Sequence, residues 1–411
     1  MANETDVLVV GGGATGAGIA RDLALRGVDV TLVERDGIGS GTSGRSHGLL
    51  HSGARYAEAD RVGAEECLEE NEILRDIAGA CIRDTGGLFV QLAGDDPDYF
   101  EAKRAACEDI GIPVEELDGD EARERVPNLA AETERAMTVP DAVIYPSRLC
   151  AANAADARDH GATIHTHAPV EGITRDGGTV TGVEVGGSVD TTITADYVVN
   201  ATGAWAGKLA GMAGLDVEMQ PNRGVMLSVE YDGLDPVLNR CRDPDDGDIV
   251  VPHGDEVVLG TTSIDVDDPD DFETDQTEVE RTRAECGAML PPVEDAPEVR
   301  TWWGIRPLFA PDEQARGGRG ISRGFFLLDH ADDGVENMAS IVGGKLTTYR
   351  QMAAAAADLA CDHLDVDAES TTADERLPYV EDPARLDDLV AEFDGQGPTD
   401  EDVVGEGEQT A

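Results

Sequence analysis

The clearest pattern of apolar and polar positions is a strand, turn, helix and strand at the N-terminus. Residues 6–10 are largely apolar and have the length of a strand. A helical pattern follows to about residue 26, and a second apolar run over residues 29–33 ends at Glu34. Strands that alternate with helices in this way predict an α/β fold with a parallel sheet.

The turn between the first strand and the helix reads Gly11-Gly12-Gly13-Ala14-Thr15-Gly16, a G-x-G-x-x-G motif. In a dinucleotide-binding unit, Gly11 permits the tight turn, Gly13 lets the backbone approach the pyrophosphate, and Gly16 lets helix and strand pack closely. The N–H groups at the start of the helix then face the phosphates. Glu34 is placed to accept hydrogen bonds from the adenosine ribose, and its charge opposes a 2′-phosphate. The unit therefore predicts an adenine dinucleotide other than NADP.

Two later segments favour FAD over NAD. Residues 197–203 form a strand that runs into an Ala-Thr-Gly turn, after a stretch over residues 170–196 that resembles a β-meander. Flavoproteins of the two-dinucleotide-binding type use such a turn to bring a second strand end against the FAD. Residues 341–345 end another apolar strand at a glycine pair and Lys345, and a helix is predicted over residues 346–364. A second helix N-terminus suits the electron-rich edge of a flavin.

Composition narrows the class of protein further. The 411 residues carry 85 acidic and 31 basic side chains, a formal net charge of −54, and only three of the basic residues are lysines. This balance excludes a nucleic-acid binder, which needs a basic face, and it suggests a proteome adapted to high salt. The seven cysteines occur singly, with no C-x-x-C pair, so we expect reduced thiols, no metal and no iron–sulfur cluster.

No segment predicts export or a membrane span. The N-terminus does not have the pattern of a cleavable signal, and no apolar run approaches the ~18 residues that a spanning helix needs. We expect a cytoplasmic protein, in which any contact with the inner face of the cell membrane is peripheral and made through partners.

A close family resemblance lies in the stretch Gly39-Ser40-Gly41-Thr42-Ser43-Gly44-Arg45-Ser46-His47-Gly48-Leu49-Leu50-His51-Ser52-Gly53-Ala54-Arg55-Tyr56. It resembles the FAD-dependent sn-glycerol-3-phosphate dehydrogenases, particularly the A subunits of the anaerobic, multi-subunit enzymes. The resemblance continues, in family order, through motifs at residues 87–89, 200–205, 239–242, 260–263, 304–308, 322–324, 327–330 and 343–350. It therefore covers roughly residues 5–365.

The resemblance implies an α/β fold like that of D-amino-acid oxidase, in which a Rossmann-like FAD-binding domain is interleaved with an antiparallel-sheet substrate domain. We expect the FAD-binding domain in residues 1–75, 148–215 and 325–364, and the substrate domain in residues 76–147 and 216–324. Apolar runs at residues 225–229, 249–251, 257–259 and 301–305 predict the antiparallel sheet over the flavin. Residues 365–411 are predicted as an acidic extension, with an amphipathic stretch near 383–393 and a solvated tail from 394.

The resemblance and the glycine motifs together give a set of candidate cofactor-binding residues. They come from the dinucleotide motif, the stretch after the second strand, and the two later turns. The set is Gly11, Gly13, Ala14, Thr15, Gly16, Glu34, Arg35, Gly41, Thr42, Ser43, Arg45, Ser46, His47, Leu49, Val170, Ala201, Thr202, Gly203, Gly343, Gly344, Lys345, Leu346 and Thr347.

Four cations are candidates for binding the substrate. Glycerol 3-phosphate carries a dianionic phosphate, which arginine binds through paired N–H groups and lysine binds as a point charge. Arg55, Arg306, Arg323 and Lys345 lie near glycines, in predicted loops or at strand ends, where the resemblance implies contacts with substrate and flavin. A single arginine of this kind is more often a surface or salt-bridge residue, but four cations at such positions together favour a substrate site. Arg55, Arg306 and Lys345 are also expected to act at the reacting centre.

His51 is the candidate for the base that takes the hydroxyl proton while a hydride passes from C2 to flavin N5. The alternative is a histidine that packs beside the flavin or bonds to a backbone carbonyl. Tyr56 either donates to the substrate phosphate or walls the cavity. His253 is a weaker candidate for a catalytic group, and His47 is expected to support its loop.

The resemblance implies oxidation of glycerol 3-phosphate to dihydroxyacetone phosphate, with electrons passing to a quinone through partner subunits. Three alternatives stay open: an oxidase that uses oxygen, a related oxidoreductase acting on amines or 2-hydroxy acids, and a non-catalytic flavin-binding subunit. The chain departs from the family pattern at its C-terminus, because the cysteine-rich extension of the A subunits is not part of this sequence. Two possibilities therefore stay open: a partner subunit accepts the electrons directly from FAD, or the chain is a shortened paralogue or a truncated reading frame.

Overall fold

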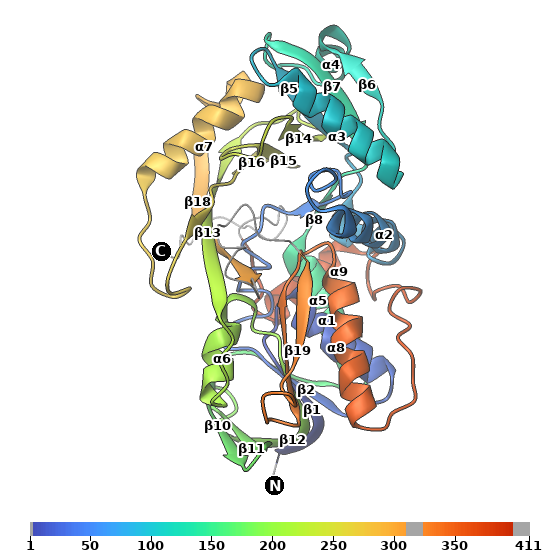
Figure 1. Cartoon of the computed structure of the whole chain (residues 1–411), viewed down its shortest axis with the longest axis vertical. Helices are drawn as coiled ribbons and strands as arrows, with labels where there is room; N and C mark the ends of the chain where they lie inside the picture. The colour runs from blue at the N-terminus through green and yellow to red at the C-terminus, as the bar shows by residue number, and fades with distance from the viewer. Residues whose placement is uncertain (1–2, 310–323, 398–411) are drawn as a thin grey trace.

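The computed structural model describes residues 3–309 and 324–397 (Figure 1). Two large sheets and a small one make up its β-structure. Figure 1 shows the first sheet in the lower part of the molecule and most of the second sheet in the upper part. Among the described residues, no helix is long and apolar enough to cross a membrane.

The first sheet has eight strands and contains the predicted dinucleotide unit. Six strands follow the order β10-β11-β12-β1-β2-β9, and β20 pairs with both β12 and β19. Their bounds are β1 Asn3–Val10, β2 Val30–Val33, β9 Thr163–His165, β10 Val170–Asp176, β11 Thr179–Val185, β12 Thr191–Asn200, β19 Phe325–Asp329 and β20 Met338–Gly343. Strand β1 is parallel to both β2 and β12, and β20 is parallel to β12. The predicted parallel sheet and β-meander are confirmed.

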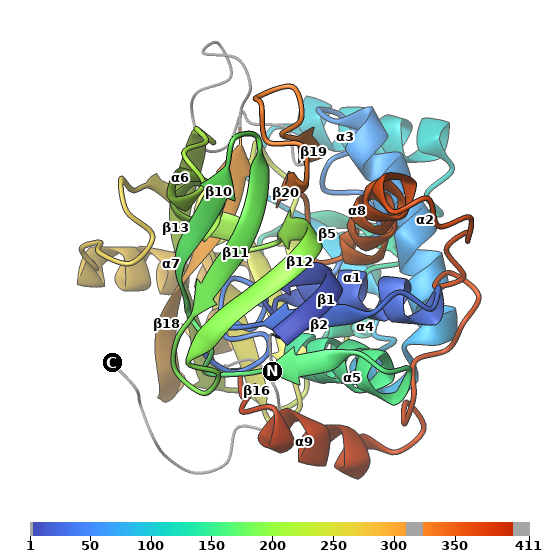
Figure 2. The ribbon, with the colours of Figure 1, turned by 90° about the horizontal axis from the view of Figure 1, so that it is seen from below.

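Both faces of the first sheet are buried, which explains the continuous apolar runs. Val7 and Val9 contribute to a core shared with α1 (Ala14–Leu25), α5 (Pro146–Asp159) and α8 (Tyr349–His363). Leu8 and Val10, which point to the opposite face, pack with the meander and α6 (Ala206–Met212). Figure 2 shows α1, α5 and α8 to one side of the sheet and α6 on the other.

The second sheet has nine strands and covers the cavity described below. Eight strands follow the order β17-β13-β16-β15-β14-β5-β7-β6, and β18 pairs with β13. The bounds are β5 Gly87–Leu92, β6 Glu116–Asp118, β7 Thr133–Val139, β13 Met219–Glu230, β14 Val237–Arg240, β15 Ile249–His253, β16 Glu256–Gly260, β17 Ile264–Asp265 and β18 Glu298–Phe309. The four apolar runs predicted as strands lie in β13, β15, β16 and β18.

Residues of the second sheet alternate between its two faces. Val225 and Leu227 pack with helix α7 (Gln276–Met289), whereas Met226 between them packs with Trp302 on the opposite face. The antiparallel pairing of β13 with β16 and β18 makes this alternation possible. Met226 is one of the residues that line the cavity.

The small sheet joins parts of the chain that we assigned to different domains. It contains β3 (Leu49–Leu50), β8 (Ala142–Ile144) and β4 (Ile82–Arg83), with β8 in the middle. The remaining helices are α2 (Arg61–Ile77), α3 (Pro97–Ile110), α4 (Gly119–Arg125) and α9 (Pro383–Glu392). The two large sheets draw their strands from the expected segments, while the predicted domain boundaries stay a prediction.

Two predictions near the C-terminus need correction. The helix predicted over residues 346–364 begins at Tyr349, because Lys345 to Thr348 form a turn in which the Thr348 hydroxyl bonds to the backbone of Lys345. The tail predicted from residue 394 is wrong for residues 394–397. The Gly395 N–H donates to the Val390 carbonyl, and a side chain on Gly37 would lie 1.7 Å from the Asp394 oxygen. Residues 398–411 lie outside the described part of the chain.

Candidate active site

A cavity of about 840 Å³ lies between the two large sheets. The carboxyl ends of β1, β2, β12 and β20 reach its wall, and β13 and β18 of the second sheet line its opposite side. In open α/β sheets, ligands bind outside the carboxyl ends of the parallel strands. The fold therefore places the predicted dinucleotide motif at the expected edge of the sheet.

The glycine motif shapes one end of the cavity. Gly11 has φ 107°, and a Cβ there would lie 2.7 Å from the Ala201 carbonyl oxygen. A Cβ on Gly16 would lie 1.8 Å from the Gly11 oxygen, so only glycine lets helix α1 start this close to β1. Gly13 is the N-cap of α1 and makes no side-chain cap, while the Ala14 N–H donates to Ser43 Oγ. This is a cradle for a pyrophosphate at a helix start.

Glu34 directly follows β2, at the rim of the same cradle. Its Oε2 accepts from the Gly12 N–H at 2.6 Å, and its Oε1 accepts from the Asp36 N–H at 3.0 Å. Burial raises the pKa of this carboxyl, and the two backbone bonds work in the opposite direction. A carboxylate oxygen has more than one lone pair, so Glu34 keeps acceptor capacity for ribose hydroxyls.

His51 and Tyr56 lie together where the loop after β3 passes the cavity. Tyr56 Oη and His51 Nε2 are 3.4 Å apart, and the ring centroids are separated by 5.2 Å. The His51 N–H donates to Thr347 Oγ1, and the Asn71 side chain donates to the His51 carbonyl. The backbone of His51 is thus held on both sides, which orients its ring toward the cavity that it lines.

Lys345 brings a buried positive charge to the cavity wall. Its Nζ lies 4.9 Å from the centre of the Tyr56 ring, in contact with the π-face. Among the described residues, no hydrogen-bond acceptor lies within bonding distance of this buried ammonium. A buried charge without such a partner is costly to the fold, so the position is explained best by an anionic or electron-rich ligand.

The two described arginines of the predicted cation set are held differently. The nearest nitrogen of Arg55 lies 3.7 Å from the buried carboxylate of Asp248. Arg306 donates from Nη1 to Asn222 Oδ1 at 2.6 Å and from Nη2 to the Thr262 carbonyl at 2.9 Å. Both guanidinium groups line the cavity, as Lys345 does.

Two histidines lie at this wall: His47 lines the cavity, and His253 is buried behind it. Burial, together with the charges of Arg306 and Arg55, lowers the pKa of His47 to about 3. Burial also lowers the pKa of His253 to about 4, and its Nε2 lies 3.2 Å from the His47 carbonyl oxygen. His253 is outside the cavity lining, so the structure gives it a supporting place rather than a catalytic one.

The comparisons with known proteins agree with this geometry. Residues 6–350 match the model of the FAD dependent oxidoreductase family. The chain is 49% identical to the A1 subunit of the anaerobic glycerol-3-phosphate dehydrogenase of Haloferax volcanii, over 97% of this chain and 70% of that protein. It is 44% identical to the A subunit of the Escherichia coli enzyme, over 93% of this chain and 71% of that protein.

The chain belongs to the FAD-dependent oxidoreductases, within the family of anaerobic glycerol-3-phosphate dehydrogenase A subunits. Solved structures support the same fold. A glycerol-3-phosphate dehydrogenase from Bacillus halodurans, complexed with FAD, superimposes with a TM-score of 0.70 at 26% identity, over 94% of this chain and 71% of that one. The L-α-glycerophosphate oxidase of Mycoplasma pneumoniae, with FAD bound, superimposes with a TM-score of 0.75 at 19% identity. The match covers 92% of this chain and 99% of that one.

The residues of this flavoprotein fit FAD. The glycine cradle would hold the pyrophosphate, Glu34 would hold the ribose, and the turn around Gly343 and Lys345 would face the flavin. Most of the predicted site residues line this cavity, and Lys345 belongs to both predicted sets. They are Gly11, Gly13, Ala14, Thr15, Glu34, Arg35, Gly41, Thr42, Ser43, Arg45, Ser46, His47, Leu49, His51, Arg55, Tyr56, Val170, Ala201, Thr202, Gly203, Arg306, Gly343, Gly344, Lys345 and Leu346.

Two predicted site residues do not line the cavity, and a third lies outside the described residues. Gly16 lies behind the cradle, where it lets α1 pack on β1, and Thr347 is a fully buried residue that bonds to the His51 backbone. Neither lines the cavity, so both support the site instead of contacting a ligand. Arg323 lies outside the described residues.

Several cavity residues were missed from the sequence. Trp205 and Lys208 follow the Ala-Thr-Gly turn, and Asp270 lies in the acidic loop after β17. The Trp205 indole N–H and Lys208 Nζ both donate to the carboxylate of Asp270 at 2.6 Å. Trp205 was visible as part of a family motif, but nothing in the local pattern links it to a loop that starts about 60 residues later.

Proposed function

We propose that this protein oxidises sn-glycerol 3-phosphate to dihydroxyacetone phosphate. The observation that carries the proposal is the buried ammonium of Lys345, which has no described acceptor and shares a cavity wall with Arg55, Arg306 and His51. Cations around one confined space suit a small dianionic phosphate ester. The relatives from Haloferax volcanii and Escherichia coli are named as subunits of glycerol-3-phosphate dehydrogenases.

The glycine cradle and the turn around Gly343 would hold FAD, which would supply the acceptor for the hydride from C2 of the substrate. The chain's own residues then have three tasks. Lys345 and the two arginines bind the anion and orient the polyol, and Tyr56 completes the wall beside them. His51 takes the proton of the C2 hydroxyl through Nε2, the nitrogen that faces Tyr56. Strands β13 and β18 line the cavity and would shield the bound substrate from water.

Arg306 attracts the anion mainly through its positive charge, because its terminal N–H groups are bonded within the protein. Four of the N–H···O contacts of its two terminal nitrogens are made within the protein, to Asn222, Arg223, Thr261 and Thr262. A guanidinium held in this way keeps a constant orientation while the ligand changes. Lys345, by contrast, has its N–H donors available for a substrate oxygen.

We further propose that the electrons leave to a quinone through partner subunits, with the chain located in the cytoplasm or peripherally on the membrane. The relatives are named as A subunits, and this chain spans about 70% of their length. Arg323 is proposed as a fourth cation of the substrate site on the family resemblance alone.

The test of the substrate is anaerobic reduction of the bound flavin. Holoprotein purified in high salt should lose its main visible flavin absorbance when glycerol 3-phosphate is added without oxygen. Glycerol, which lacks the phosphate, and lactate, a 2-hydroxy acid, should leave the spectrum unchanged at equal concentrations. Persistence of the oxidised spectrum with glycerol 3-phosphate, or equal bleaching by lactate, would contradict the assignment.

The same sample tests the electron acceptor. Flavin that has been reduced by glycerol 3-phosphate should be reoxidised by a soluble quinone analogue, added anaerobically, much faster than by air. Rapid reoxidation by air with formation of peroxide, and none by the quinone, would identify an oxidase instead.

A further inference from the structure

Arg306, Asn222 and Asp265 stand in one row across three neighbouring strands. Asn222 on β13 is the direct partner of Arg306 on β18 and of Asp265 on β17. Directly opposed residues of adjacent strands project from the same face of a sheet. A cation, an amide and a carboxylate therefore lie side by side at the edge of the cavity.

The amide of Asn222 contacts both neighbours. Arg306 Nη1 donates to Asn222 Oδ1 at 2.6 Å, and Asn222 Nδ2 donates to Asp265 Oδ1 at 2.8 Å. Ser263 Oγ also donates to Asn222 Oδ1, at 3.1 Å. The orientation of the amide follows from its neighbours, because a guanidinium only donates hydrogen bonds and a carboxylate only accepts them.

Asn222 is fully buried, so its amide has no solvent alternative. The other side of the Arg306 guanidinium is bound by Thr261 Oγ1 at 3.1 Å and the Thr262 carbonyl at 2.9 Å, both from Nη2. The planar group is thus held at two edges, and it lines the cavity with Thr261 and Thr262.

We propose that Asn222 is a positioning residue, a neutral spacer that keeps Arg306 directed at the bound anion and prevents it from pairing with Asp265. Two strand spacings, about 10 Å, separate the backbones of Arg306 and Asp265. An extended arginine and an aspartate side chain together span such a distance. Without the amide between them, the two opposite charges would attract each other along the sheet, and the cation would leave the cavity.

The proposal rests on the proposed function only for the identity of the substrate. That any anion binds beside Arg306 can be measured separately, with inorganic phosphate as the probe. Phosphate binding to the oxidised holoprotein would be followed by calorimetry and by the change in flavin absorbance, with no turnover involved.

Three variants test the spacer: Asn222→Ala, Asp265→Asn, and the two together. Asn222→Ala should weaken phosphate binding about tenfold, the scale of a lost bond to a charged group. Asp265→Asn alone should stay within about twofold of the unchanged protein, because the amide already separates that carboxylate from Arg306. The double variant should regain most of the lost affinity, since the competing carboxylate is gone.

The recovery in the double variant separates positioning from a structural role. A residue needed only for packing would give a double variant at least as weak as Asn222→Ala, and that result would overturn the proposal. So would unchanged phosphate affinity in Asn222→Ala, or no phosphate binding in the unchanged protein. FAD content and the melting temperature are measured for each variant. If Asn222→Ala releases FAD, the comparison is repeated with Asn222→Ser, which leaves a hydroxyl in place of the amide.

Kinetics provide the second readout and distinguish the two proposals. With glycerol 3-phosphate, Asn222→Ala should raise KM more than it lowers kcat. In the double variant, the added Asp265→Asn change should bring KM back toward that of the unchanged protein. If glycerol 3-phosphate fails to reduce the flavin but the variants bind phosphate as predicted, the substrate assignment is wrong and the positioning role of Asn222 is supported. If glycerol 3-phosphate reduces the flavin but all variants bind phosphate with equal affinity, the positioning role of Asn222 is wrong and the substrate assignment is supported.

Discussion

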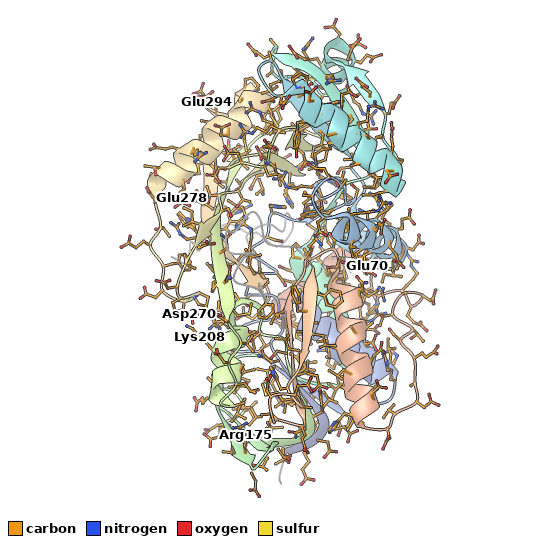
Figure 3. All side chains as sticks on the ribbon, viewed as in Figure 1. Glu70, Arg175, Lys208, Asp270, Glu278 and Glu294 are labelled. Carbon is orange, nitrogen blue, oxygen red and sulfur yellow. The ribbon has the colours of Figure 1, made fainter. Side chains whose placement is uncertain are left out.

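The ammonium of Lys208 lies 2.6 Å from Asp270 Oδ2, and this ion pair ties helix α6 to the loop after β17. Figure 3 shows the two side chains beside each other at the edge of the molecule. Trp205 and Arg35 also reach the Asp270 carboxylate, with Arg35 stacked on the indole ring at 4.4 Å. We call these four residues the clasp. It joins the two large sheets at the end of the cavity next to Glu34.

Opening the clasp should speed the release of FAD. Asp270→Asn removes the charge that Lys208 and Arg35 share, and we expect FAD to dissociate about threefold to tenfold faster, since exposed ion pairs contribute little individually. Asp267→Asn is the matched control, because it makes the same change at an exposed position of the same loop. Release is measured by the rise of free-flavin fluorescence after dilution. Equal rates for the two variants would contradict a role in retention.

The glycine cradle makes a stronger prediction. In Gly16→Ala, the new Cβ would lie 1.8 Å from the Gly11 carbonyl oxygen, so α1 must move away from β1 and the cradle must open. We expect the variant to be purified without FAD and to melt well below the unchanged protein. Gly211→Ala in α6 is the control, because a Cβ there meets nothing within 4 Å and alanine favours a helix. Normal FAD content in Gly16→Ala would show that the backbone is held less tightly than described.

The buried histidines predict how stability depends on pH. Burial lowers the pKa of His253 to about 4, whereas an unfolded histidine titrates near 6.5. Between these values the unfolded chain binds a proton that the folded chain does not. The free energy of unfolding should therefore fall as the pH drops below about 6.5, by up to ~1.4 kcal/mol per pH unit for this residue.

His253→Gln tests that dependence, because glutamine keeps an N–H for the His47 carbonyl and cannot take up the proton. Urea unfolding at pH 7.0 and pH 5.5 in the same salt should show a smaller loss of stability in the variant than in the unchanged protein. The pKa of His47 is also lowered, to about 3, so this histidine destabilises the fold in the same pH range. Because His47 is present in both proteins, part of the pH dependence should remain in the variant. Parallel losses in the two proteins would mean that His253 is protonated in the fold.

The sequence predicted the parts of the site that depend on local pattern. The turn from Gly11 to Gly16, the acid at Glu34 and the Ala-Thr-Gly turn each combine a short motif with the strand beside it, so their places followed from neighbouring residues. The fold class and the FAD cofactor followed from the same motifs and from the family resemblance, and both are confirmed.

The parts that were missed depend on pairing between distant strands. The row of Arg306, Asn222 and Asp265 needs the register of β13 with β17 and β18, which no local period reveals. The packing of residues 394–397 was missed for a similar reason. A charged and glycine-rich composition suggested solvent exposure, but Gly395 closes the end of α9 against residues near Gly37.

The three lysines of the chain provide the last prediction, because two of them are buried in opposite circumstances. Lys103 donates to the Ala54 carbonyl at 3.0 Å and to Glu58 Oε2 at 2.7 Å. Lys345 has a buried ammonium with no acceptor among the described residues and with the Tyr56 ring beneath it. The first charge stabilises the fold, and the second is held there at a cost to it.

Replacement by methionine, which is similar in size and uncharged, should therefore have opposite effects at the two positions. Lys345→Met should raise the melting temperature of the ligand-free protein while weakening glycerol 3-phosphate binding on the order of 100-fold, since the anion loses a desolvated partner. Lys103→Met should lower the melting temperature, because it removes the donor of the Ala54 carbonyl and of Glu58 Oε2 and leaves Glu58 with only the Tyr99 hydroxyl. Differential scanning calorimetry and anaerobic flavin titration measure the two effects. A Lys345→Met protein that melts lower and still binds the substrate would show that this ammonium serves the fold and not the ligand.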